Sequence, residues 1–123
     1  MTINLKGELI DLLQPKIMGI LNLTPDSFYD GGQFNVLDRA LEQTEKMIYE
    51  GAFFIDLGAC STKPGAKDIS EDEEKKRLYP ILEKLIEKFP KQHFSIDTYR
   101  SSVAAGSIDR GASMINDISG GQF

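Results

Sequence analysis

Short apolar runs alternate along the chain with longer segments in which apolar residues recur at helical spacing. The apolar runs predict four strands, at residues 17–21, 53–57, 94–96 and 114–118. The periodic segments predict three helices, at residues 36–50, 70–89 and 101–110. Strands that alternate with amphipathic helices are typical of βαβ units, so we expect an α/β fold with a parallel sheet. Because the apolar runs are nearly continuous, we expect both faces of this sheet to be covered.

Several residues mark the ends of the predicted helices. Ser70 and Glu73 form the Ser-x-x-Glu pattern of a capping box, which predicts the start of the second helix. Pro80 falls inside that helix and either kinks it or divides it into a short leading turn and a main helix. Gly51 stands where a helix end favours a residue in the left-handed conformation.

A weak internal repeat indicates a barrel. Residues 51–56 (Gly-Ala-Phe-Phe-Ile-Asp) match residues 111–116 (Gly-Ala-Ser-Met-Ile-Asn), and each stretch contains a helix end, a small residue, a strand and a polar residue. Recurrence of this unit favours a (β/α) barrel over a single α/β sandwich. An eight-stranded barrel takes about 250 residues, so we expect about four parallel strands and three helices forming the N-terminal half of one. If this half folds alone, its two unpaired strand edges predict association with another chain.

A polar residue closes each of the four predicted strands: Asn22, Asp56, Asp97 and Asn116, the last followed by Asp117. In parallel α/β structures these strand ends share one face, where ligands bind. One such residue can simply cap the next turn, but recurrence at every strand favours a ligand site at Asn22, Asp97 and Asn116. For Asp56 and Asp117 both interpretations remain open.

Composition narrows the classes of function. The formal net charge of −5 argues against non-specific binding to nucleic acid, which needs clustered positive charge. Cys60 is the single cysteine, so no internal disulfide framework or multi-cysteine metal site can form. No apolar run approaches the roughly 18 residues of a membrane-spanning helix. We therefore expect a cytoplasmic protein without a membrane partner, and we place His93, the only histidine, on the surface at the opposite rim.

Residues 18–28 (Met-Gly-Ile-Leu-Asn-Leu-Thr-Pro-Asp-Ser-Phe) provide the most specific motif. Composition alone favours a turn-rich loop over residues 22–32, in which Pro25 sets one turn and the glycine pair at residues 31–32 sets another. However, the stretch closely resembles the first signature of dihydropteroate synthases. Three further stretches resemble the later signatures of that family, in the family's order: residues 51–56 with 61–66, residues 95–98, and residues 115–118.

The resemblance implies that residues 1–123 are the N-terminal part of a pterin-binding TIM-barrel domain from a cytoplasmic, homodimeric enzyme of folate biosynthesis. This enzyme joins 6-hydroxymethyl-7,8-dihydropterin diphosphate to p-aminobenzoate, and releases 7,8-dihydropteroate and diphosphate with the help of Mg²⁺. The roles implied for individual residues divide among the metal, the two substrates and the diphosphate. Asn22 would help hold Mg²⁺. The pterin would be contacted by Thr62, Asp97 and Asn116. The p-aminobenzoate pocket, which sulfonamides also occupy, would be formed in part by Phe28 and Pro64, and Asp30 would help order the diphosphate site.

Physical chemistry supports these implied roles. A carboxylate and a carboxamide on neighbouring strand ends can match the donors and acceptors along the edge of a pterin. If carbon–oxygen cleavage precedes attack by the amine, positive charge develops on the pterin, and Asp97 would act as the catalytic group that stabilises it. Lys63 departs from the arginine usual in the family and lacks the bidentate fork, so no arginine contact is carried over to it.

Two other hypotheses about the function remain open. A methyltetrahydrofolate methyltransferase would resemble the motifs around Asp97 and Asn116, but it would not combine residues 22–28 with residues 61–65. The second alternative is a non-catalytic, self-associating half-barrel fragment with at most a partial pterin site. Since the family's later segments supply further substrate contacts, we expect the 123 residues alone to lack synthase activity.

Overall fold

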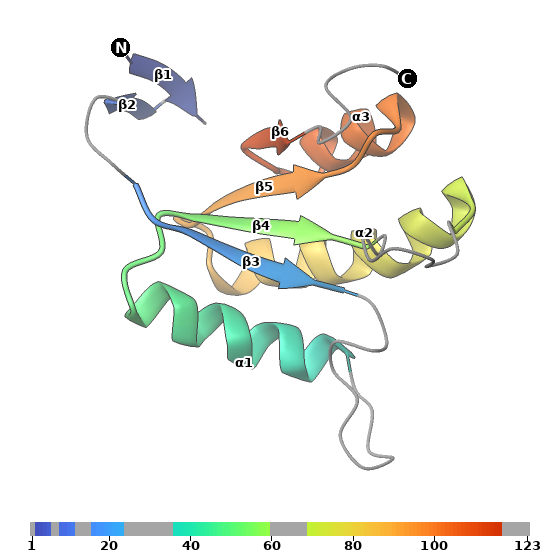
Figure 1. Cartoon of the computed structure of the whole chain (residues 1–123), viewed down its shortest axis with the longest axis horizontal. Coiled ribbons are helices and arrows are strands. Elements are labelled where there is room, and N and C mark those ends of the chain that lie inside the picture. Colours follow the sequence, from blue (N-terminus) through green and yellow to red (C-terminus); the bar gives the residue numbers. More distant parts are fainter. Residues whose placement is uncertain (1, 6–7, 12–15, 24–35, 60–68, 117–123) are drawn as a thin grey trace, which may run out of the picture.

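The computed structural model describes residues 2–5, 8–11, 16–23, 36–59 and 69–116. Its centre is a four-stranded parallel sheet with the strand order β3-β4-β5-β6, and a helix connects each strand to the next (Figure 1). The predicted parallel sheet is thus confirmed. Its strands are β3 (Met18–Asn22), β4 (Phe54–Gly58), β5 (His93–Asp97) and β6 (Met114–Asn116). The helices are α1 (Val36–Tyr49), α2 (Glu71–Lys88) and α3 (Ser101–Asp109).

The two faces of the strands carry different side chains. Ile55 and Leu57 of β4 and Phe94 and Ile96 of β5 are fully buried and pack in the main core with leucines of α2. Because side chains alternate along a strand, the residues between them point to the other face. Phe54 belongs to that other face, where it forms a separate small apolar cluster. The helices therefore cover one face of the sheet, and the opposite face is available for polar groups.

β3 differs from the prediction of a strand buried on both faces. Leu21 is buried in the main core, whereas Ile20 is 67% exposed and Met18 is 39% exposed. β3 is an edge strand that pairs with β4, and α1 packs beside it. Ile20 and Met18 alternate with Leu21 and so point to the face that carries no helix in the described part of the chain. The prediction of full coverage is therefore wrong for β3.

The internal repeat seen in the sequence has a structural counterpart at two helix ends. Gly51 after α1 and Gly111 after α3 have φ angles of +101° and +109°. The N–H groups of Ala52 and Ala112 donate to carbonyl oxygens five residues earlier, at 2.9 Å and 3.0 Å. This is the Schellman arrangement, which satisfies carbonyl groups left over at a helix end. The same device therefore turns the chain from helix to strand before β4 and before β6.

α2 begins as its capping pattern predicts. The Glu73 N–H donates to Ser70 Oγ at 3.1 Å, and Ser70 has the extended backbone of a helix cap. The helix then continues through Pro80 to Lys88, so Pro80 does not divide it into two helices. Pro80 lies on the exposed side, where water can satisfy the carbonyl group that loses its partner.

Two features were not anticipated from the pattern. β1 (Thr2–Leu5) and β2 (Glu8–Asp11) form an antiparallel two-stranded sheet of their own, before the parallel sheet begins. His93, predicted to be a surface residue, is 5% exposed. It starts β5, as the predicted rim requires, but its ring lies 5.0 Å from the ring of Phe53 and its Nδ1 is 3.0 Å from Ser113 Oγ. Neighbours from distant parts of the sequence therefore bury it.

The two positive-φ glycines make a matched pair for mutation. Gly51→Ala should lower the free energy of unfolding by about 1 kcal/mol, because an L-residue is strained in the left-handed region. Gly111→Ala should cost more, since its Cβ would also lie 3.1 Å from Ile86 Cδ1, whereas the nearest atom to a Cβ at Gly51 is 3.9 Å away. Equilibrium unfolding in urea measures both changes. Equal losses would contradict the contribution of Ile86.

Candidate functional site

The carboxyl ends of the four parallel strands lie along one edge of the sheet (Figure 1). The register of the strands brings three predicted residues together at that edge. Asn22 pairs with Gly58, Gly58 with Asp97, and Asp97 with Asn116 across the sheet. Paired residues of a parallel sheet point to the same face, and this face is opposite the main core. We call these four residues the strand-end row. The three polar side chains of the row, predicted separately from their strands, thus share one edge and one face.

Gly58 leaves room in this row for the carboxylate of Asp97. A Cβ atom at position 58 would lie 3.4 Å from Asp97 Cβ and 3.6 Å from Asp97 Oδ2. The carboxylate of Asp97 therefore lies beside the bare backbone of β4, on the side toward Asn22. Any side chain larger than methyl at position 58 would compete for the space next to the Asp97 carboxylate.

A second polar group lies deeper on the same face. Asp56 precedes Gly58 by two residues, is 4% exposed, and accepts a hydrogen bond of 2.8 Å from Ser95 Oγ. The side chain of Asn116 also hydrogen-bonds to Asp56. Burial raises the pKa of the Asp56 carboxyl above its usual range, and the hydrogen bonds from Ser95 and Asn116 oppose that rise. We call Asp56, Ser95 and Asn116 the Asp56 cluster.

From the sequence, Asp56 could be either a ligand residue or a cap of the next turn, and Ser95 was not predicted to belong to the site. The available signal was register: a parallel sheet with Asp97 opposite Gly58 necessarily places Ser95 opposite Asp56. Ser95 is the only residue with a hydroxyl group within the predicted strand at residues 94–96. A polar residue in an otherwise apolar buried strand requires a hydrogen-bond partner, and Asp56 provides it.

Two arginines that the sequence did not single out hold the backbone near the strand ends. Arg100, just before α3, pairs with the fully buried Glu74 at 2.7 Å and donates to the carbonyl oxygen of Ile69 at 2.6 Å. Arg77 of α2 donates to the carbonyl oxygen of Ala59 at 3.4 Å. Ala59 and Ile69 flank residues 60–68, so the two arginines fix the backbone on either side of that segment.

The remaining predicted site residues lie outside the described residues: Phe28, Asp30, Thr62, Pro64 and Asp117. Within the described ranges, no group of three His, Cys, Asp or Glu side chains is arranged to hold a metal ion. Among the described helices, none combines the length and the apolar character that crossing a bilayer requires.

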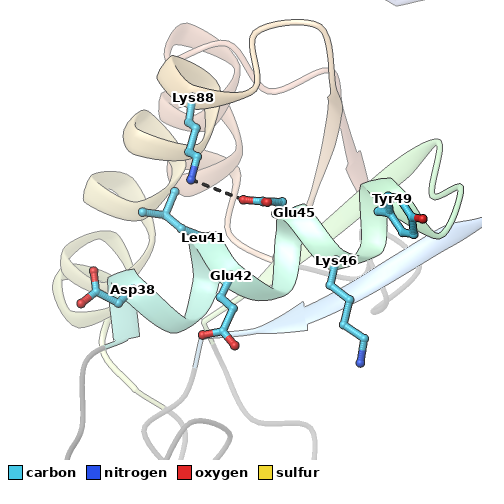
Figure 2. A pocket seen from close by; sticks show the side chains of 7 residues that line it. All are labelled: Asp38, Leu41, Glu42, Glu45, Lys46, Tyr49 and Lys88. Carbon is cyan, nitrogen blue, oxygen red and sulfur yellow. Dashed lines mark ion pairs between the residues drawn. The ribbon is translucent and has the colours of Figure 1, made fainter.

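A separate hollow of about 570 Å³ lies on the outer side of α1 (Figure 2). Glu45 and Lys88 form an ion pair of 3.6 Å across it, and Tyr49 at its end is 93% exposed. It is lined by Asp38, Leu41, Glu42, Glu45, Lys46, Tyr49 and Lys88. No residue of the strand-end row borders this hollow, so the row remains the candidate site.

Comparison with known proteins identifies the family. Residues 18–123 match the family model described as pterin binding enzyme. The chain belongs to the family of pterin-binding enzymes. It is 50% identical over 104 residues to the dihydropteroate synthase of Bacillus subtilis, a match that covers 85% of this chain and 36% of that protein. The chain therefore spans about a third of the length of this relative, and the resemblance to dihydropteroate synthases found in the motifs is confirmed.

Solved structures of pterin-binding enzymes agree with the fold. The Xanthomonas albilineans dihydropteroate synthase with 4-aminobenzoic acid aligns with a TM-score of 0.90 at 35% identity, covering 98% of this chain and 45% of that one. The Yersinia pestis enzyme in complex with a sulfonamide drug aligns with a TM-score of 0.86 at 45% identity, covering 99% and 44%. The predicted fold class, the N-terminal half of a (β/α)8 barrel, is confirmed.

Burial of Asp56 makes a pH-dependent contribution to stability. The pKa of its carboxyl is raised in the folded state, so the folded protein holds this proton more tightly than the unfolded chain does. Relative to Asp56→Asn, the wild-type free energy of unfolding should therefore be highest below the ordinary pKa of 3.8. It should fall as the pH rises and level off once the folded-state carboxyl is ionised.

Urea unfolding of the wild type and Asp56→Asn from about pH 3 to about pH 8 measures this difference, because the range begins below the ordinary aspartate pKa and ends well above it. Asp109→Asn is the control, because Asp109 is exposed at the end of α3. A wild-type advantage that grows with pH would contradict the stated cause.

Proposed function

We propose that the chain forms the pterin-binding part of a dihydropteroate synthase, a cytoplasmic homodimer that joins 6-hydroxymethyl-7,8-dihydropterin diphosphate to p-aminobenzoate. The observation that carries the proposal is the strand-end row. It places Asn22, Asp97 and Asn116 on one face and at one edge of the sheet, in a chain related to synthases along most of its length. Ligands of parallel α/β folds bind at this end of the strands.

Asp97 and Asn116 are the groups that bind the pterin. They are direct partners on neighbouring strands, so their side chains lie next to one another. The carboxylate accepts hydrogen bonds from ring and amino N–H groups, and the carboxamide adds a second polar contact of fixed geometry. This pair holds the flat heterocycle by its edge.

Asp97 also assists the reaction. The bond between the pterin methylene carbon and the diphosphate oxygen breaks and diphosphate leaves, while the amine nitrogen of p-aminobenzoate forms the new bond to that carbon and gives up one proton. As the first bond breaks, positive charge spreads over the pterin, and the carboxylate of Asp97 stabilises it. Such stabilisation is strong where water is excluded. Asp97 is half-buried, so its surroundings favour this effect.

Asn22 fits a role toward Mg²⁺. It is exposed at the end of β3, and its amide oxygen is a hard donor of the kind that Mg²⁺ prefers. A single protein ligand is enough where substrate phosphates and water complete the coordination. When bound, Mg²⁺ supplies the charge that neutralises the departing diphosphate. Asp30 is proposed to order the same diphosphate site.

Thr62, Phe28 and Pro64 complete the proposal. We assign Thr62 to the pterin, and Phe28 and Pro64 to the p-aminobenzoate pocket, which sulfonamides would also occupy. Support comes from the related Yersinia pestis and Xanthomonas albilineans enzymes, solved with a sulfonamide drug and with 4-aminobenzoic acid. Arg77 and Arg100 also donate hydrogen bonds to Ala59 and Ile69, the residues on either side of the segment that contains Thr62 and Pro64.

Pterin binding tests the proposal directly. Isothermal titration with pterin should show binding to the wild-type protein and a loss of roughly 10-fold or more in Asp97→Ala, the cost expected for removing a charged hydrogen-bond partner. Asp109→Ala removes the same charge from the exposed end of α3 and should bind like the wild type. Equal binding by all three proteins would refute the assignment of Asp97.

We do not expect the 123 residues alone to catalyse the reaction. The chain spans 36% of the Bacillus subtilis relative, and we expect the purified 123 residues to form no 7,8-dihydropteroate from the two substrates and Mg²⁺. Chromatographic detection of the product checks this, with an intact synthase as the positive control. Formation of product by the 123 residues would show that the strand-end row and its neighbours are sufficient.

A further inference from the structure

The proposed function makes no use of Asp56, a buried carboxylate only two residues from the strand-end row. Its side chain points to the same face as Asp97, since residues 56 and 58 share a face and Gly58 pairs with Asp97. It contacts Asn116, which is itself a member of the row. A direct connection therefore runs from a buried charge to one of the groups assigned to the ligand.

The chemistry of this connection fixes the direction of the hydrogen bonds. An ionised carboxylate can only accept, so every hydrogen-bonding partner of Asp56 must donate. Ser95 donates its hydroxyl proton at 2.8 Å. Asn116 can donate only from the NH₂ group of its side chain. The amide nitrogen of Asn116 therefore faces Asp56, and its carbonyl oxygen faces away from it.

Amide orientation matters because the two ends of an asparagine amide have opposite hydrogen-bonding character. With its nitrogen committed to Asp56, Asn116 presents an acceptor beside the carboxylate of Asp97, its partner in the sheet. Two neighbouring acceptors suit a ligand edge with two neighbouring N–H donors. With the amide reversed, a donor would lie next to the carboxylate, and the same ligand edge would meet one mismatched group.

We propose that Asp56 is a positioning residue, which orients the amide of Asn116 so that its carbonyl oxygen and the Asp97 carboxylate together receive the N–H donors of the pterin. This inference rests on the proposed function, and it assigns to the Asp56 cluster the selection of a donor-rich ligand edge. Asp56 acts through Asn116 and does not contact the ligand itself.

The position of Asp56 argues against a purely structural role. Burying a carboxylate is costly compared with burying an apolar residue of similar size. On the opposite, helix-covered face of β4 and β5, the adjacent residues Ile55 and Phe94 are apolar and fully buried. A charged acceptor two residues below the row therefore costs stability that a leucine would not. Its benefit is the fixed orientation of Asn116.

Two substitutions of similar size separate positioning from packing. Asp56→Leu removes the acceptor, so Asn116 loses its fixed orientation, and affinity for pterin should fall by roughly 10-fold. Asp56→Asn keeps one acceptor oxygen, so the hydrogen bond from Asn116 can still form. Its affinity for pterin should therefore stay within about 3-fold of that of the wild type. Isothermal titration with pterin measures both, and circular dichroism confirms that both fold.

Nuclear magnetic resonance of the Asn116 side chain gives a readout that packing alone would not move. In the wild type, one amide proton of Asn116 should be shifted downfield and protected from exchange, and Asp56→Asn should retain this signature. Two Asn116 amide protons with ordinary shifts and fast exchange in the wild type would overturn the proposal, whether or not Asp56→Leu folds. Pterin affinity that is unchanged in a folded Asp56→Leu would overturn it as well.

Asn116→Ala separates this inference from the proposed function. If Asn116→Ala weakens pterin binding and Asp56→Leu does not, the site stands and the positioning role of Asp56 fails. If neither Asn116→Ala nor Asp97→Ala weakens binding, the proposed pterin site itself fails, and the positioning role fails with it.

Discussion

The register of the parallel sheet is the constraint on which the rest of the molecule depends. Pairing of Asn22 with Gly58, of Gly58 with Asp97 and of Asp97 with Asn116 places the polar groups side by side. A slip of one residue in any strand would move its polar residue to the helix-covered face and its apolar residues to the open face. Burial of the alternate apolar residues therefore fixes the position of the candidate site as well as the fold.

The Schellman turns at Gly51 and Gly111 set this register from outside the sheet. Each ends a helix at a defined residue and is followed by a buried alanine, after which the next N–H joins the neighbouring strand. Phe53 donates to Ile17 and Ser113 donates to Phe94 in this way, both at 2.8 Å. Since both turns use the same geometry, β4 and β6 enter the sheet in the same way, each in register with the strand before it in the sheet order.

Much of this organisation could be predicted from local patterns. Apolar runs, helical spacing, the Ser70 cap and Gly51 are signals that depend only on residues close together in the sequence. They predicted the three helices and the four parallel strands. The buried contacts of His93 and the ion pair between Arg100 and Glu74 could not be found in this way, because their partners come from positions 20 and 26 residues away. The β1 and β2 strands were missed because polar residues interrupt them, so neither forms the apolar run that predicted the other strands.

The candidate site therefore combines two kinds of information. Position along each strand decides which residues reach the strand-end row, and this much follows from the sequence. Which atom each residue presents depends on contacts across the sheet: Ser95 and Asn116 are brought to Asp56 only by pairing of β4, β5 and β6. A carboxamide identified by a motif is chemically ambiguous until a neighbour fixes its orientation. In this fold the neighbour is a buried carboxylate, so the polarity of the site is determined one layer below the residues assigned to the ligand.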